Sequence, residues 1–231
     1  EYEGQEKLLA SHVLIIGAGG LGSSTSIYLA SSGIGKLTIC DFDKVELSNL
    51  QRQILHNDAA IGMNKAKSAK NFLEKLNPNI EVEAIEDKLD MDSMKEIAKS
   101  TDVIIDCSDN FYTRYALNQI AYDLKKPLVS GAAIKFEGQL SVFDLTSEVS
   151  PCYECLFPDA KDEQELRCAD HGVFSPLVGM IGTAQAAETI KILLSIGSPL
   201  VGKLATLDIK TMRWQTFIVK KDPHCKVCGT H

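Results

Sequence analysis

Hydrophobic residues recur along this chain with two periods that alternate. Short apolar runs that end at a polar residue or glycine are typical of buried strands, whereas apolar positions three and four residues apart are typical of helices. The polar stretch 42–58 fits neither pattern, and we expect a loop with one or two helical turns there. Strands are predicted at residues 12–17, 36–41, 80–85, 102–107, 127–132 and 138–145, and helices at residues 21–32, 64–77, 91–100 and 111–124.

This alternation predicts an α/β fold, with a Rossmann-like, mainly parallel sheet and helices on both faces. Ligands of such sheets gather at the carboxyl ends of the strands. The pattern changes after Leu145, where about thirty residues lack clear periodicity, longer than an ordinary connection. We expect one domain over residues 1–231, divided into a nucleotide-binding half (1–145) and a second half (146–231). The second half is predicted to contain this crossover segment, a long helix at 176–196, antiparallel strands at 202–209 and 214–219, and a tail.

The long helix is also the longest apolar stretch, but it contains Gln185, Glu188 and Lys191, which favours a buried helix over a membrane span. The polar start, residues 1–10, lacks the apolar core of a signal peptide, and we expect a short native segment to precede Glu1. We therefore expect a cytoplasmic protein without a membrane partner. The formal net charge of -7 offers no broad basic face, which argues against nucleic-acid binding.

The first strand runs into "GAGGLG", a turn that contains Gly17, Gly19, Gly20 and Gly22. Glycines let the backbone turn sharply and approach a phosphate closely, and the helix behind them presents N–H groups and the positive end of its dipole. Asp41 stands at the end of the second strand, where a carboxylate can accept a hydrogen bond from a ribose hydroxyl. The pattern predicts an adenosine-nucleotide site; a packing turn without ligand is the alternative.

Further polar residues, Asn49, Arg52 and Gln53 in "SNLQRQ" and then Lys65, are expected on the rim of the same pocket. The pyrophosphate of NAD is already neutralised by a glycine turn and its helix, whereas a triphosphate under attack needs extra cations. The cluster therefore favours ATP chemistry over an NAD-dependent oxidoreductase. An oxidoreductase would also need an acid or base, and no histidine is near the strand ends of the first half in the sequence. Arg52 and Lys65 as solvated surface charges remain the alternative.

The segment "DCSDN" ends another buried strand in two carboxylates, Asp106 and Asp109. Mg²⁺ is usually bound through one or two carboxylates together with nucleotide phosphates. Asp109, beyond the strand, is better placed for Mg²⁺ than Asp106, which is expected to cap or bond locally. Asn110 is a candidate for the nucleotide site or for the cap of the next helix.

Two C-x-x-C pairs, Cys152 with Cys155 and Cys225 with Cys228, are typical of a tetrahedral Zn²⁺ site. Four thiolates leave no open coordination position, so the zinc would be structural; redox dithiols or metal-free pairs are the alternatives. Cys168 lies in the irregular segment beside Arg167, and it is a candidate nucleophile or an inert thiol.

These motifs together resemble the ThiF/MoeB family (HesA/MoeB/ThiF), the adenylyltransferases that activate ubiquitin-like sulfur carriers in thiamine and molybdopterin biosynthesis, related to ubiquitin-activating enzymes. The resemblance rests on GAGGLG, "DFD", SNLQRQ, Lys65, DCSDN, "GAAIKFEGQ" and the paired C-x-x-C, and it covers nearly the whole chain in order. It implies a Rossmann-like homodimer with structural zinc, in which ATP-Mg²⁺ meets the C-terminal glycine of a carrier that ends in Gly-Gly.

The resemblance further implies that the carrier's carboxylate attacks the α-phosphate and releases pyrophosphate. Asp41 would hold the ribose, Arg52 and Lys65 the phosphates, and Asp109 the Mg²⁺, with Asn49 and Gln53 as polar supports. The counterpart of Cys168 forms a covalent adduct with the carrier in only part of the family. The family's arginine before the first strand has no match here, because "EYEGQEKLLA" contains none. A dehydratase of the tRNA threonylcarbamoyladenosine type and a non-catalytic adaptor are the remaining alternatives.

Overall fold

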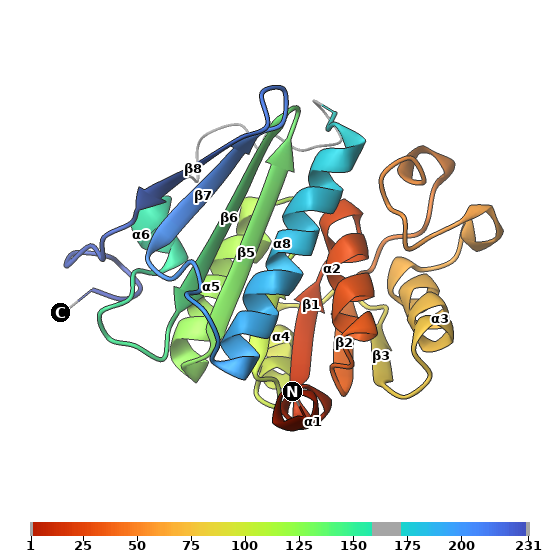
Figure 1. Cartoon of the computed structure of the whole chain (residues 1–231), viewed down its shortest axis with the longest axis horizontal. Helices are drawn as coiled ribbons and strands as arrows, with labels where there is room; N and C mark the ends of the chain where they lie inside the picture. The colour runs from red at the N-terminus through yellow and green to blue at the C-terminus, as the bar shows by residue number, and fades with distance from the viewer. Residues whose placement is uncertain (1, 159–171, 230–231) are drawn as a thin grey trace.

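One eight-stranded sheet organises the residues described by the computed structural model, which are 2–158 and 172–229 (Figure 1). The strands are β1 (His12–Ile16), β2 (Lys36–Cys40), β3 (Glu81–Ile85), β4 (Val103–Asp106), β5 (Pro127–Ile134), β6 (Glu137–Asp144), β7 (Lys203–Asp208) and β8 (Arg213–Ile218). The helices are α1 (Tyr2–Ala10), α2 (Gly20–Ser31), α3 (Lys65–Leu76), α4 (Met91–Ala98), α5 (Phe111–Leu124), α6 (Tyr153–Leu156) and α8 (Ser175–Leu194), with short 3-10 turns η1 (Leu47–Asn49) and η2 (Asp58–Ala60).

The strand order across the sheet is β3-β2-β1-β4-β5-β6-β7-β8. The strands from β3 to β5 pair in parallel, and β6, β7 and β8 extend the sheet in antiparallel pairs. The predicted Rossmann-like α/β sheet and its antiparallel C-terminal strands are therefore confirmed. From β1 the chain continues to β2 and β3 on one side of the sheet and then returns to β4 and β5 on the other. The switch point therefore lies between the neighbouring strands β1 and β4, and open α/β sheets bind ligands at such a point.

Helices cover both faces of the sheet, and its central strands are therefore buried on both sides. Alternate residues of β1 point to opposite faces: Val13 and Ile15 belong to one core cluster, and Leu14 and Ile16 to the other. Figure 1 shows α2 and α8 side by side in front of the sheet, with α4 and α5 behind it. Helix α3 packs against α2, against the edge strand β3 and against its neighbour β2.

Helix α8 is the one helix of the described segments that is long and apolar enough to cross a membrane. In this fold it packs across the sheet against α2, β5 and β6, and its polar residues are satisfied internally. Gln185 Nε2 donates to the Asp106 carbonyl at 2.7 Å, and Glu188 Oε2 accepts from Leu200 N at 2.8 Å. The prediction of a buried helix is confirmed, with its ends at Ser175 and Leu194.

Helix α1 is an element that the sequence patterns did not predict. Only Leu8 among its residues is buried, so it lacks an apolar stripe. Its position depends on distant contacts: Gly35 N donates to the Leu8 carbonyl at 2.9 Å, and Gln5 Nε2 donates to the Ser32 carbonyl at 3.1 Å.

Candidate active site and cysteine cluster

The glycine turn lies at the carboxyl end of β1, and two of its glycines have no room for a side chain. Gly17 has a φ of 101°, and a Cβ there would come within 2.7 Å of the Cys107 carbonyl oxygen. A Cβ on Gly22 would come within 2.0 Å of the Gly17 carbonyl oxygen. These glycines are therefore needed for the turn to close against β4, whatever it binds.

The other two glycines stand where α2 begins. A Cβ on Gly20 would come within 2.8 Å of Val178 Cγ2, so this position lets α8 approach. Gly19 is the N-cap and supplies no capping side chain, and the nearest atom to its Cβ position is Gln53 Nε2 at 3.6 Å. The first N–H groups of α2 lack intrahelical acceptors, and this end of the helix dipole favours an anion.

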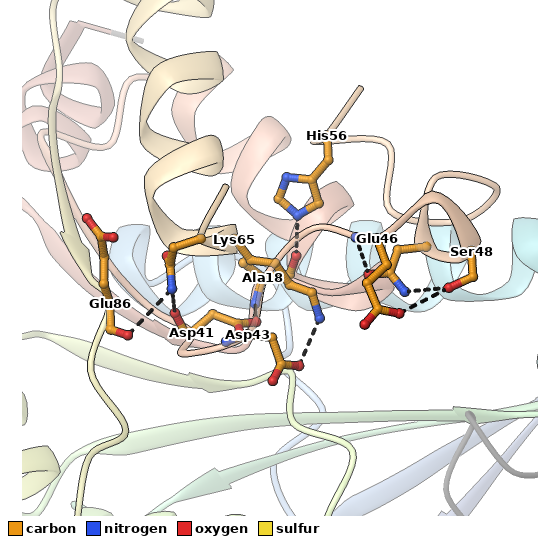
Figure 2. Close-up of polar contacts among 10 residues, drawn as sticks. Ala18, Asp41, Asp43, Glu46, Ser48, His56, Lys65 and Glu86 are labelled. Carbon is orange, nitrogen blue, oxygen red and sulfur yellow. Dashed lines mark hydrogen bonds and ion pairs between the residues drawn. The ribbon is translucent and has the colours of Figure 1, made fainter. Parts of the chain in front are cut away.

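Asp41 follows β2 and holds the glycine turn through the main chain (Figure 2). Its Oδ2 accepts from Ala18 N at 2.8 Å, and its Oδ1 accepts from Asp43 N at 2.9 Å. Burial raises the pKa of the Asp41 carboxyl, and the Lys65 charge opposes that shift. A carboxylate has about four lone-pair positions, so two observed bonds leave acceptors for a ribose hydroxyl. Its expected nucleotide contact is compatible with this geometry and stays a prediction.

The expected loop at 42–58 contains η1, and three of the predicted rim residues lie in or beside it. Asn49 is buried, and its Oδ1 accepts from Glu46 N at 3.2 Å. Arg52 Nη1 donates to the Ser48 carbonyl at 3.2 Å. Gln53 is 4% exposed, and its Oε1 has no hydrogen-bond partner among the residues that the structure describes. This amide lies beside Gly19, and a ligand could satisfy its buried oxygen.

Lys65 is the first residue of α3, and only 7% of it is exposed. Its Nζ pairs with the Asp43 carboxylate, as Figure 2 shows, at 2.9 Å from Oδ2. Its main-chain N–H donates to the Asp43 carbonyl at 2.8 Å. Asp43 in turn donates its N–H to Asp41. The ammonium group is thus held beside the carboxylate that binds the glycine turn.

His56 is a residue of this site that the sequence interpretation missed. We expected no histidine near the strand ends of the first half, and this was wrong. His56 is distant from those ends in the sequence, but in the folded chain its Nε2 lies 2.9 Å from the carbonyl oxygen of Ala18, just after β1 (Figure 2). Its Nδ1 lies 2.8 Å from Ser68 Oγ on α3. A histidine in a polar loop gives no sequence signal of burial, so only the packing of that loop could identify it.

The "DCSDN" segment divides into residues that support the fold and one that is exposed. Asp106 is 1% exposed and accepts from Ser108 Oγ at 2.6 Å, which confirms the expected local bonding. It also accepts from Ser130 Oγ on β5 at 2.8 Å. Asn110 is the N-cap of α5, since its Oδ1 accepts from Thr113 N at 2.9 Å. Asp109 is exposed. It follows directly after Cys107 and Ser108, the two residues that lie against Gly17.

The four paired cysteines come together in one cluster in which all four sulfurs lie within 4.8 Å of one another. Cys152 Sγ lies 3.6 Å from Cys225 Sγ, and Cys155 Sγ lies 3.4 Å from Cys228 Sγ. Tetrahedral Zn²⁺ with bonds of about 2.3 Å requires sulfur–sulfur separations of about 3.8 Å. The cluster therefore fits a metal ion, and it joins α6 to the C-terminal tail.

Of the remaining cysteines, Cys40 and Cys107 are buried at strand ends, as expected of core residues. Burial raises the pKa of the Cys107 thiol to about 12, so it stays protonated at neutral pH. Cys168, the candidate nucleophile, lies outside the described residues, as does Arg167.

Comparisons with known proteins agree with this fold. Residues 1–227 match the family model described as "ThiF family". The chain is 43% identical over 229 residues to the molybdopterin-synthase adenylyltransferase of Salmonella typhimurium, covering 99% of this chain and 91% of that protein. It is 42% identical over 231 residues to the sulfur carrier protein adenylyltransferase of Thermus thermophilus, covering 98% and 85%. The crystal structure of E. coli MccB with AMPCPP and MccA superposes with a TM-score of 0.85 at 25% identity, covering 98% and 69%.

A Rossmann-like sheet with a glycine turn, a buried lysine beside it and a four-cysteine cluster fits a nucleotide-binding α/β protein and does not determine its reaction. The family match and the named relatives narrow it: the chain belongs to the ThiF family and is an adenylyltransferase. The predicted family and the predicted class of enzyme are confirmed.

Proposed function

We propose that this adenylyltransferase uses ATP to activate the C-terminal glycine carboxylate of a ubiquitin-like sulfur carrier protein that ends in Gly-Gly. The observation that carries the proposal is the uncapped start of α2, with the Gln53 side-chain amide beside Gly19 and Lys65 held next to Asp43; the Gln53 Oε1 has no partner within the described part of the chain. The names of the relatives favour a sulfur carrier as the substrate, and those named for molybdopterin synthase favour a carrier of the molybdopterin type.

In the proposed reaction a carboxylate oxygen of the carrier attacks the α-phosphorus of ATP. The new bond is an acyl–phosphate C–O–P linkage, the bond between the α-phosphorus and the bridging oxygen breaks, and diphosphate leaves. Negative charge builds up on the phosphoryl oxygens and on diphosphate, so nearby cations stabilise the transition state more than the ground state. No proton has to be removed from the nucleophile, because a terminal carboxylate is ionised at neutral pH.

We assign the phosphates to the start of α2, at Gly19, Gly20 and Gly22, together with Lys65 and Arg52. Burial of Lys65 keeps its charge in a region of low effective dielectric, where an ammonium stabilises a phosphate more strongly than it does in water. The Arg52 guanidinium donates to a main-chain carbonyl of its own loop, that of Ser48, so it can turn to a phosphate at little cost.

We assign the ribose to Asp41 and the Mg²⁺ of ATP-Mg²⁺ to Asp109, an exposed carboxylate next to the residues that contact Gly17. Asn49, Gln53 and the N-cap Asn110 are proposed as polar supports near the nucleotide. We also propose that the four-cysteine cluster holds Zn²⁺ in a structural role, since four thiolates would fill a tetrahedral ion.

Beyond the site, we propose a single ThiF-type domain, a homodimer and a cytoplasmic location. Whether Cys168 forms a bond with the carrier is tested by mass spectrometry of a trapped adduct.

The experiment that tests the function is ATP–pyrophosphate exchange with purified protein and purified carriers of the molybdopterin and thiamine types. We expect exchange that depends on the carrier and on its terminal Gly-Gly. A carrier lacking the last glycine is the matched control, and titration with NADH in place of ATP tests the oxidoreductase alternative. If none of these carriers supports exchange and the protein binds NADH tightly, the proposal is overturned.

A further inference from the structure

The His56 side chain binds the peptide unit between Ala18 and Gly19. The Ala18 carbonyl accepts from His56 Nε2 at 2.9 Å, while the Ala18 N–H, which belongs to the preceding peptide unit, donates to Asp41 (Figure 2). Asp41 and His56 thus hold two successive peptide units of the glycine turn from different elements of the fold.

The direction of the Ala18 carbonyl determines the direction of the Gly19 N–H. In a planar trans peptide the C=O and N–H bonds point in opposite directions. With its C=O turned toward His56, this unit presents the Gly19 N–H on the other side, at the start of α2. Gly19 has φ of -82°, and a flip of the unit would carry that φ into the positive region, which glycine adopts readily. A flipped unit would present a carbonyl oxygen, which repels phosphate.

His56 is itself held in one tautomer. A carbonyl oxygen only accepts, so Nε2 carries the proton, and Nδ1 of the neutral ring accepts from the Ser68 hydroxyl at 2.8 Å. The residue is 6% exposed. Burial lowers the pKa of His56, and the Lys65 charge lowers it further, so the neutral form persists at neutral pH.

The same contacts connect the turn to the helix that carries Lys65. Ser68 and Lys65 stand three residues apart on α3 and therefore share one helical face. His56 bridges that face and the Ala18 carbonyl, so the position of the Lys65 ammonium and the orientation of the Gly19 N–H depend on one packed unit.

We propose that His56 is a positioning residue for the nucleotide: it orients the Ala18–Gly19 peptide so that the Gly19 N–H donates to a phosphate of ATP. This inference rests on the proposed use of ATP at the glycine turn. His56 does not contact the reacting atoms and transfers no proton.

The test compares His56→Leu, which removes the donor, with His56→Gln, whose side-chain amide can still donate to Ala18. His12 offers a matched control, because its ring likewise bridges two groups, Ser100 O at 3.0 Å and Thr38 Oγ1 at 2.8 Å, at the opposite end of β1. ATP dissociation constants, the KM for ATP, the KM for the carrier and thermal unfolding are measured for each variant. The Gly19 amide resonance is followed by NMR as ATP is added.

We expect His56→Leu to raise the dissociation constant and the KM for ATP about ten- to a hundred-fold, because the variant loses one hydrogen bond to a charged group. The KM for the carrier should be nearly unchanged. His56→Gln should recover most of the ATP affinity, and the ATP-induced shift of the Gly19 resonance should vanish only in His56→Leu. His12→Leu should lower the unfolding temperature and leave ATP affinity as in the wild type.

Unchanged ATP affinity in a folded His56→Leu variant overturns the inference. An ATP affinity of His56→Gln that is as low as that of His56→Leu overturns it as well. If His56→Leu does not fold, Ser68→Ala carries the test: it releases the ring and should raise the KM for ATP several-fold, and an unchanged KM overturns the inference. If the wild-type protein does not bind ATP, the proposed function itself is refuted. If the wild type binds ATP and the His56→Leu variant binds it equally well, only the inference about His56 is refuted.

Discussion

Replacing Lys65 by methionine removes one positive charge and keeps much of the side chain's length and apolar volume. Lys65 is 7% exposed and pairs with Asp43, whose side chain is 54% exposed. A pair with one exposed partner contributes at most about 1 kcal/mol to stability. For a chain of this size that corresponds to a fall of about 2–4 °C in Tm. The Lys65→Met variant should therefore still fold.

The effect on catalysis should be much larger. One unit charge about 4 Å from a phosphoryl oxygen contributes about 4 kcal/mol at an effective dielectric constant of about 20. Each 1.36 kcal/mol is a factor of ten in rate, so we expect Lys65→Met to lower kcat/KM for carrier-dependent ATP–pyrophosphate exchange by about a thousand-fold. The assay is exchange of labelled pyrophosphate into ATP, with circular dichroism and Tm to confirm folding.

Two further variants separate the phosphate role from the ion pair. Lys70→Met, on the same helix, removes a charge that pairs with Glu74 at 3.5 Å on the surface and should leave exchange unchanged. Asp43→Asn removes the carboxylate partner of Lys65 but keeps the main-chain bond to Asp41. We expect Asp43→Asn to retain most of the activity. A folded Lys65→Met variant that kept more than about a tenth of the wild-type kcat/KM would refute the electrostatic argument, and equal losses in Lys65→Met and Asp43→Asn would assign Lys65 to the ion pair.

Three more outcomes are expected. Arg52→Ala should lower exchange by about a hundred-fold or more with little change in Tm, because its guanidinium contacts the Ser48 carbonyl in its own loop; wild-type exchange would remove Arg52 from the site. Removing metal with a chelator should lower Tm and expose the C-terminal tail to proteases, and a metal analysis that finds no zinc in the purified protein would contradict a zinc site. Burial lowers the pKa of His56 and of His12 below 6.5. Below about pH 6.5 these histidines therefore bind more protons in the unfolded chain than in the folded chain, and the free energy of unfolding should fall as the pH drops. In urea titrations at pH 7.5 and about 5.5, His56→Gln should lose less stability than the wild type, and an equal loss would contradict this linkage.

The strands and most helices could be predicted because their signals are local. The run Val13–Ile16 followed by Gly17 specifies a buried strand and a tight turn within a few residues, and the periodic apolar positions of α3 specify a helix that Asn64 caps. Helix α1 could not be predicted for the opposite reason. Its order comes from contacts with α8 and with the segment before β2, and a nine-residue helix with one buried side chain leaves no periodic pattern.

The candidate site shows the same division. The glycines, Asp41, Lys65 and the paired cysteines could be identified as candidates because each residue type suits its chemistry at that spacing. The hydrogen-bond partners of these side chains could not be predicted from the sequence. Asp41 uses one oxygen to bind Ala18, 23 residues earlier in the chain, and Asp106 accepts a hydrogen bond from Ser130, 24 residues later.

By itself the sequence determined the alternation of strands and helices, the glycine turn, the cationic segment after the second strand and the two cysteine pairs, since these follow from backbone sterics, side-chain periodicity and short spacings. Only the tertiary structure decided the strand order, the meeting of cysteine pairs 73 residues apart and the contact between His56 and Ala18 across 38 residues. The physical reason is that such contacts depend on how the loop and α3 pack against the sheet. That packing is the sum of many weak interactions across the chain, and no short stretch of residues contains it.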